Sequence, residues 1–198
     1  MKKKMVRGWI VAALLAACVP ALAPAQAAPA GEFDKAYGAF AAAAAAKDYA
    51  GALAALRRLV TAFGSQSPLL LGNVRFVKGA SNSYGLFEPR GSDAFADGEA
   101  IYLYAEPAGY TFKKSPAGHY EFGFKADFQV ADEGGKVLGG QNGFAVLPFR
   151  SWNPNSEVAI TFTYTFSGLQ KGRYKITTQV ADMNSAKKAA CEKWFTVQ

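Results

Sequence analysis

Two segments of the chain alternate apolar and polar residues, and this alternation constrains the fold more than any other feature. The apolar positions are Tyr120, Phe122, Phe124, Ala126, Phe128 and Val130 in the first segment, and Val158, Ile160, Phe162, Tyr164 and Phe166 in the second. A period of two places one set of side chains on each face of a strand. The pattern therefore predicts strands with one buried and one solvated face, which is typical of antiparallel sheets.

Further segments with strand character fill the chain beyond residue 68, and residues that favour turns separate them. The expected strands cover residues 69–77, 100–106, 119–131, 144–149, 157–166, 173–181 and 190–197. No helical period interrupts them, which favours two packed sheets. We predict a mainly β fold class, an antiparallel immunoglobulin-like β-sandwich of about seven strands over residues 69–198.

An α-helical hairpin is expected to precede this sandwich. Residues 32–63 are rich in alanine, and their apolar residues recur at steps of three and four. Asp48 interrupts the period and is placed to cap a second helix. The apolar stripe of that second helix either packs against the rest of the chain or binds a partner.

Two stretches resemble known families. The residues A-x-x-K-D-Y-x-x-A-L, positions 44–53, resemble the turn and second-helix start of a tetratricopeptide repeat. The motif occurs once, whereas a solenoid needs about three repeats, so the resemblance implies a single hairpin. The residues G-x-Y-x-I-x-x-x-V-x-D, positions 172–182, and the strand after them resemble the closing hairpin of bacterial immunoglobulin-like domains. As a whole, the helical hairpin and aromatic-rich sandwich resemble uncharacterised exported proteins of proteobacteria.

The first residues have the pattern of an export signal. Four basic residues precede an uncharged apolar run of about ten residues, and a membrane-spanning helix needs about twenty. Small residues at Ala25 and Ala27 favour cleavage before Ala28, which makes residues 1–27 a signal peptide. Alternatively, residues 15–18 resemble the lipobox of bacterial lipoproteins, with a signal over residues 1–17 and a lipidated Cys18.

The two cleavage patterns predict different mature proteins. Cleavage before Ala28 gives a periplasmic or secreted chain without a transmembrane helix, and lipidation of Cys18 gives one anchored to the bacterial membrane. Mass spectrometry of the mature N-terminus distinguishes them, because the first residue is either an unmodified Ala28 or an acylated Cys18. An intact Met1 would contradict both predictions.

Charge and cysteine content restrict the partners and the covalent bonds. Four of the 22 basic residues and none of the 15 acidic ones lie in the predicted signal, which leaves 18 against 15, a net charge of +3. A charge of this size provides no electrostatic surface for nucleic acid, so no nucleic-acid partner is expected. Cys191 is the only cysteine beyond the signal and is expected to be a small buried apolar side chain.

Catalytic motifs are not evident along the chain. His119 is the only histidine and begins an expected strand, so no histidine-based triad or zinc site is apparent. Glu99 and Glu106 stand at opposite ends of one expected strand, about 20 Å apart, which is too far for a glycosidase pair. The glycine-rich residues 139–143 open no helix and favour a hairpin or bulge over a phosphate loop. We therefore expect no enzyme, no cofactor and no metal site.

The candidate ligand-binding residues lie in expected loops and do not follow the alternation of the strands. They are Tyr84, Phe87, Arg90, Tyr110 and Trp152. Because they are not required in the core, they are free to contact a ligand or to close the end of the sandwich. The predicted function is a noncatalytic exported binding or scaffolding module of the bacterial cell envelope, with an envelope protein or glycan as partner. The alternatives are a carbohydrate-active hydrolase whose carboxylates converge only in the fold, and a purely structural spacer.

Overall fold

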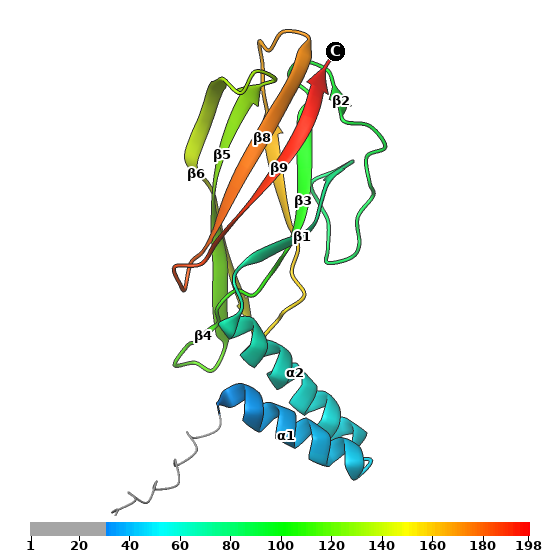
Figure 1. Cartoon of the computed structure of the whole chain (residues 1–198), viewed down its shortest axis with the longest axis vertical. Coiled ribbons are helices and arrows are strands. Elements are labelled where there is room, and N and C mark those ends of the chain that lie inside the picture. Colours follow the sequence, from blue (N-terminus) through cyan, green and yellow to red (C-terminus); the bar gives the residue numbers. More distant parts are fainter. Residues whose placement is uncertain (1–30) are drawn as a thin grey trace, which may run out of the picture.

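Two helices precede the sheets in the computed structural model, which describes residues 31–198 (Figure 1). Helix α1 spans Glu32–Ala45 and α2 spans Tyr49–Gln66. Asp48 caps α2, since its carboxylate accepts a hydrogen bond of 2.9 Å from the Gly51 amide. The predicted helical hairpin ahead of the β region is confirmed.

Nine strands follow the helices in the described part of the chain. They are β1 Leu70–Val77, β2 Ala94–Phe95, β3 Ala100–Ala108, β4 Lys113–Lys114, β5 Tyr120–Asp132, β6 Val137–Ser151, β7 Ile160–Thr165, β8 Gly172–Asp182 and β9 Lys188–Val197. The two-residue strands β2 and β4 are not expected from the sequence, because segments this short show no periodicity.

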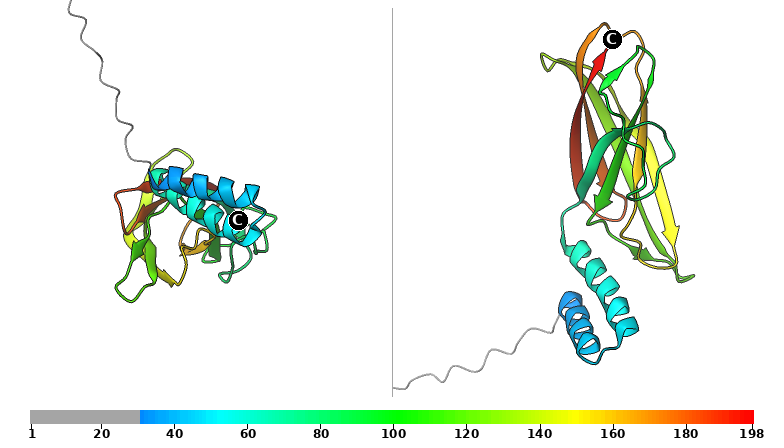
Figure 2. Two further views of the ribbon diagram at one scale, coloured as in Figure 1. Left: turned by 90° about the horizontal axis from the view of Figure 1, so that it is seen from below. Right: turned by 90° about the vertical axis from the view of Figure 1, so that its right-hand side faces the viewer.

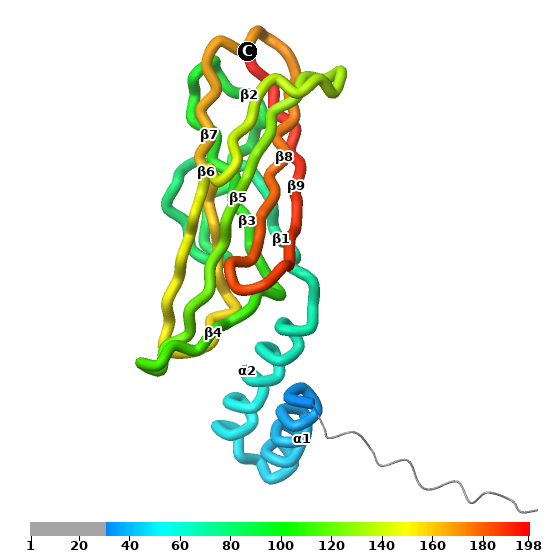
Figure 3. Tube along the Cα trace, turned by 90° about the vertical axis from the view of Figure 1, so that its left-hand side faces the viewer, coloured from blue at the N-terminus to red at the C-terminus, as the bar shows by residue number. Residues whose placement is uncertain are grey.

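The strands form two sheets that face each other. One has the order β1-β3-β7, and the other has the order β2-β9-β8-β5-β4 with β6 paired to β5. The short β2 runs parallel to β9, so the second sheet is mixed. Both sheets curl, in the manner of a half-barrel (Figures 2 and 3). The structure thus confirms a mainly β fold and corrects the expectation of a purely antiparallel sandwich.

The apolar positions of the alternating segments fill the space between the sheets. Phe124 and Phe162 are buried there, as the period of two predicts, and Ile176 of β8 and Phe195 of β9 are buried beside them. Cys191 is half-buried beside this core, and burial raises the pKa of its thiol. A raised pKa leaves less thiolate, so the side chain behaves as an apolar group of the sheet.

Strand β6 is longer than the sequence indicates, because residues 139–143 lie inside it and not between strands. Gly140 passes so close to β5 that a Cβ atom would stand 2.5 Å from the carbonyl oxygen of Phe128. Gly143 has a φ of 63°. These glycines allow a register shift in the β5–β6 ladder, and the segment is a bulge within the hairpin.

The predicted signal peptide and Cys18 lie outside the described residues. Within residues 31–198, neither helix has the length and apolar character needed to cross a membrane.

Candidate functional site

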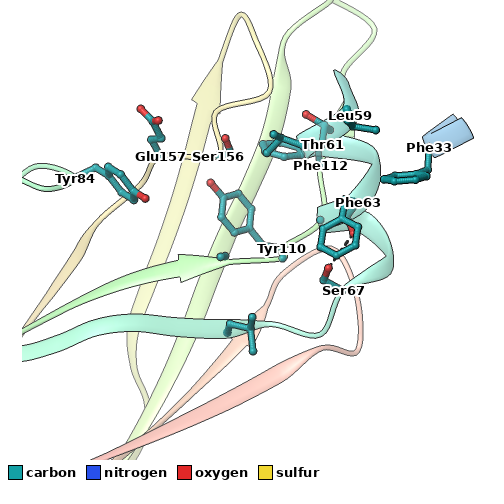
Figure 4. Close-up of a pocket in the computed structure, with 15 residues that line it drawn as sticks. Phe33, Leu59, Thr61, Phe63, Ser67, Tyr84, Tyr110, Phe112, Ser156 and Glu157 are labelled. Carbon is teal, nitrogen blue, oxygen red and sulfur yellow. Dashed lines mark hydrogen bonds between the residues drawn. The ribbon is translucent and has the colours of Figure 1, made fainter. Parts of the chain in front are cut away.

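A cleft of about 580 Å³ lies where the helical hairpin meets the near end of the sheets (Figure 4). Its walls come from the last turns of α2, the start of α1, the end of β3 and the segment that leads into β7. The lining residues are Phe33, Leu59, Val60, Thr61, Phe63, Gly64, Ser67, Leu70, Tyr84, Ala108, Gly109, Tyr110, Phe112, Ser156 and Glu157. Most of these side chains are apolar.

Lys187 holds the helical wall of the cleft in place. Its ammonium donates hydrogen bonds to the carbonyl oxygens of Gly64, Ser65 and Gly109, at 3.1, 2.9 and 2.7 Å. Gly64 and Ser65 belong to the last turn of α2, where carbonyl groups lack helical partners and a cation is favoured. One side chain from the β8–β9 turn therefore joins the hairpin to the end of β3.

Gly109 permits the close approach of these two walls. Its φ is 79°, and a Cβ atom at this position would lie 2.2 Å from the carbonyl oxygen of Pro68. Any other residue would push the end of β3 away from the linker after α2. The spacing of the cleft thus depends on a glycine.

The hairpin end of the cleft is aromatic. The rings of Phe33 and Phe63 lie 6.0 Å apart, so the two helices contribute one aromatic pair. The rings of Tyr110 and Phe112 lie 5.2 Å apart on the sheet side. Figure 4 shows Phe63 and Phe33 on the side of α2 and α1, with Tyr110 between them and the polar end.

The opposite end of the cleft is polar and carries Tyr84, Ser156 and Glu157 (Figure 4). Glu157 is exposed, and it is the one charged residue of the lining. Its carboxylate forms no ion pair with any residue in the part of the chain that the structure describes. An unpaired carboxylate at one end of an apolar cleft favours a ligand with a cationic or hydrogen-bond-donating end.

Two of the five predicted ligand-binding residues, Tyr84 and Tyr110, line this cleft. Tyr84 is exposed, as expected. Tyr110 is only 3% exposed, which corrects the expectation that it is free of the core. Burial raises the pKa of its hydroxyl, which donates a hydrogen bond to the carbonyl oxygen of Asn155. It therefore forms the floor of the cleft.

Phe87 and Arg90 are engaged in the fold. The Phe87 ring lies 4.5 Å from that of Tyr104. The Arg90 guanidinium forms an ion pair of 2.8 Å with Glu99 and lies 4.1 Å above the Phe95 ring. The Phe87 contact holds the segment between β1 and β3 against β3, and the Arg90 contacts join residues within that segment. Neither residue lines the cleft.

Trp152 is separate from the other candidates. It is 74% exposed, and its ring meets that of His119 edge to face at 5.1 Å. It does not line the cleft. The five residues predicted from the sequence therefore do not converge on one site.

A buried carboxylate network under the β1–β3 segment is not apparent from the sequence. Glu106 accepts hydrogen bonds from the Tyr104 hydroxyl at 2.7 Å, the Asn73 amide at 2.6 Å and the Gly85 N–H at 3.2 Å. Burial alone would raise the pKa of Glu106, but these bonds and the charge of Arg75 outweigh it, so the pKa is lowered. The one signal in the sequence is an acidic residue within an apolar strand, which requires partners when buried.

Burial and the hydrogen bond to Glu106 raise the pKa of Tyr104 to about 12. The Tyr104 hydroxyl is therefore protonated at neutral pH and acts as the donor to Glu106. This arrangement anchors the β1–β3 segment through Gly85 and does not contribute to the lining of the cleft.

Among residues 31–198, no group of three or more His, Cys, Asp or Glu side chains is placed to hold a metal ion. The cleft lining contains a single carboxylate, Glu157. A glycosidase pair is therefore not assembled in this cleft.

No protein-family model matches the chain, and no curated protein matches it. One solved structure similar to it is the Pseudomonas fluorescens alkylpurine DNA glycosylase AlkC, bound to DNA that contains an abasic site analog. The identity is 13% and the TM-score 0.34, and the match covers 75% of this chain. The chain spans 37% of the length of that glycosylase.

This comparison gives no support to two predictions from the sequence. The similar structure is a DNA-bound glycosylase, which does not agree with the predicted noncatalytic exported module of the cell envelope. It also does not agree with the predicted envelope protein or glycan partner and the expected absence of a nucleic-acid partner. A TM-score of 0.34 is nevertheless too low to transfer an activity or a partner to this chain.

Proposed function

We propose that this protein binds a small amphiphilic molecule in the cleft between the helical hairpin and the sheets. The ligand has an apolar body and a cationic end. The observation that carries the proposal is the cleft itself, whose space of about 580 Å³ has aromatic walls at one end and the unpaired Glu157 at the other. Binding clefts for small molecules have volumes of about 300–1,000 Å³ and few polar groups.

The energetics assign different roles to the two ends. Val60 and Phe63 line the cleft and are exposed in the absence of a ligand. Covering side chains of this size contributes roughly 1–2 kcal/mol each, so the apolar end supplies most of the affinity. Glu157 is solvent-exposed, and an ion pair there contributes about 1 kcal/mol or less. The carboxylate therefore selects the charge of the ligand.

The test uses N-phenyl-1-naphthylamine, an apolar probe whose fluorescence rises on transfer from water. Dodecyltrimethylammonium and dodecyl sulfate, both below their micellar concentrations, then compete for the probe. We expect the cation to displace it at a concentration lower by about fivefold, which corresponds to about 1 kcal/mol. The Glu157→Gln variant should lose this preference, and Phe63→Ser should weaken binding of the probe itself.

Glu133→Gln is the matched control, since Glu133 lies in the β5–β6 turn outside the cleft. Its replacement changes the net charge by the same amount as Glu157→Gln. It should retain the preference for the cation. If Phe63→Ser left binding of the probe unchanged, the probe would bind elsewhere, and this result would contradict the proposed site. Equal displacement by cation and anion in the unmodified protein would contradict the ligand class.

We also propose that the two sheets form a variant of the immunoglobulin-like sandwich. Strands β1, β3 and β7 occupy the places of strands A, B and E, and β5, β8 and β9 those of C, F and G. The hydroxyl of Tyr174, near the start of β8, donates a hydrogen bond of 2.7 Å to the carbonyl oxygen of Gln170. This bond resembles the tyrosine corner of such domains and supports the proposal.

A further inference from the structure

Helix α2 carries an apolar stripe that remains largely exposed in the described part of the chain. Its residues are Tyr49, Leu53, Leu56, Val60 and Phe63, and their exposed fractions lie between 39% and 71%. The steps between them alternate between four and three residues. We call these five residues the α2 seam. A narrow apolar stripe with this spacing is typical of a helix that packs against another helix.

Helix α1 contacts this seam at Phe63, whose ring lies 6.0 Å from that of Phe33, and its main packing is elsewhere. The buried residues of the hairpin are Ala36 of α1 and Ala52 and Ala55 of α2, so the two helices pack through small side chains on an adjacent face of α2. Figures 1 and 2 show the hairpin projecting from one end of the sheets, which leaves the first turns of α2 away from the β region. Tyr49 and Leu53 therefore lie on a surface that is open in the monomer.

The charge beside the seam is positive. Arg57 and Arg58 are the only charged residues of α2. Arg57 is four residues after Leu53 and three before Val60, so it borders the seam. Neither arginine forms an ion pair with a residue in the described range 31–198.

We propose that the α2 seam docks an amphipathic helix of another protein, with acidic residues flanking the apolar face of that helix. The seam supplies knob positions over about four turns, roughly 21 Å, which matches a helix of about two heptads. The unpaired Arg57 supplies complementary charge for a glutamate at a flanking position. The inference requires no ligand in the cleft, and Val60 and Phe63 belong to both surfaces.

Two other occupants fit the observations less well. A second copy of the chain would bring Arg57 of one α2 close to that of the other, and like charges at a helix interface are unfavourable. A membrane surface is usually bound through a broad apolar face with several basic residues, whereas this seam is narrow and α2 has two arginines.

The experiment uses a synthetic peptide of about three heptads with Leu at positions a and d and Glu at positions e and g. Like charges at e and g disfavour self-association of the peptide. A second peptide carries Lys in place of every Glu. Fluorescence anisotropy of the labelled peptides is measured against the purified chain. We expect saturable binding of the glutamate peptide, weakened by added salt, and binding of the lysine peptide weaker by at least about tenfold.

Leu53→Glu is the decisive variant, because Leu53 lies in the seam and outside the cleft. It should weaken binding of the glutamate peptide by about tenfold or more. Ala54→Glu is the matched control, since Ala54 is exposed on α2 but is not part of the seam. It adds the same charge and should retain most of the binding. Arg57→Glu should reverse the preference toward the lysine peptide, whereas Arg58→Glu, on the opposite face of α2, should retain the preference for the glutamate peptide.

Three results would overturn the inference. The first is equal binding of both peptides, and the second is unchanged binding by Leu53→Glu. The third is binding of neither peptide together with evidence for a different occupant of the seam. That evidence would be concentration-dependent dimerisation in sedimentation velocity, or binding to vesicles with anionic lipids, which Leu53→Glu abolishes. Displacement of N-phenyl-1-naphthylamine is measured in the same variants. Retained probe binding in Leu53→Glu separates failure at the seam from failure at the cleft.

Discussion

Replacement of Glu106 with alanine is expected to destabilise the protein by about 2–4 kcal/mol, because it removes the acceptor of three hydrogen bonds. The Tyr104 hydroxyl, which is buried, would lose its carboxylate partner, and the Gly85 N–H would lose one acceptor. The segment between β1 and β3 is anchored through these groups. It should therefore become sensitive to limited proteolysis, and urea unfolding should report the loss of stability.

Glu88→Ala is the matched control for this experiment. Glu88 lies on the same segment, and its ion pair with Lys78 is solvent-exposed. Exposed pairs contribute about 0–1 kcal/mol, so this variant should remain close to the unmodified protein in stability and protease resistance. Equal behaviour of the two variants would show that Glu106 does not anchor the segment.

The same network makes stability depend on pH. The pKa of Glu106 is lower in the folded protein than its ordinary value of 4.5. The folded state therefore binds fewer protons than the unfolded state, and stability decreases as the pH falls from about 4.5 through the folded pKa. Glu106→Gln removes this titration. We expect its stability relative to the unmodified protein to improve as the pH falls through this range.

Replacement of Tyr110 with alanine is the second change with a large expected effect. The Tyr110 ring is buried and lies 5.2 Å from the ring of Phe122 and 5.1 Å from that of Phe124. Truncation of a buried aromatic side chain costs about 3–5 kcal/mol. Thermal unfolding should therefore begin at a markedly lower temperature, and the cleft should lose its floor.

Tyr110→Phe and Trp152→Ala separate packing from exposure. Tyr110→Phe keeps the ring and removes the hydrogen bond to Asn155, at a cost of about 1 kcal/mol. Trp152→Ala removes an exposed ring and should change stability by about 0.5 kcal/mol or less. If Tyr110→Ala kept full stability while probe binding was lost, Tyr110 would be a ligand contact without a role in the core.

The contrast between Tyr110 and Trp152 shows why the candidate site could be predicted only in part. Both residues depart from the alternation of the strands, so both are predicted from the sequence as candidate ligand-binding residues. In the structure Tyr110 is buried among Phe112, Phe122 and Phe124, whereas Trp152 is exposed. Whether a loop residue is covered depends on what packs over it, which for Tyr110 includes the segment of Asn155, 45 residues further along the chain.

The residue pattern by itself determined the mainly β character, the burial of Phe124 and Phe162, and the helical hairpin before the sheets. Side chains at a period of two or 3.6 face one side of a strand or helix, and this property is local. Tertiary structure alone decided the cleft, the Glu106 network and the exposed seam of α2. Asn73 and Glu106 are 33 residues apart, and Lys187 reaches a carbonyl group 123 residues away. Such contacts depend on how the elements pack, which no local period encodes.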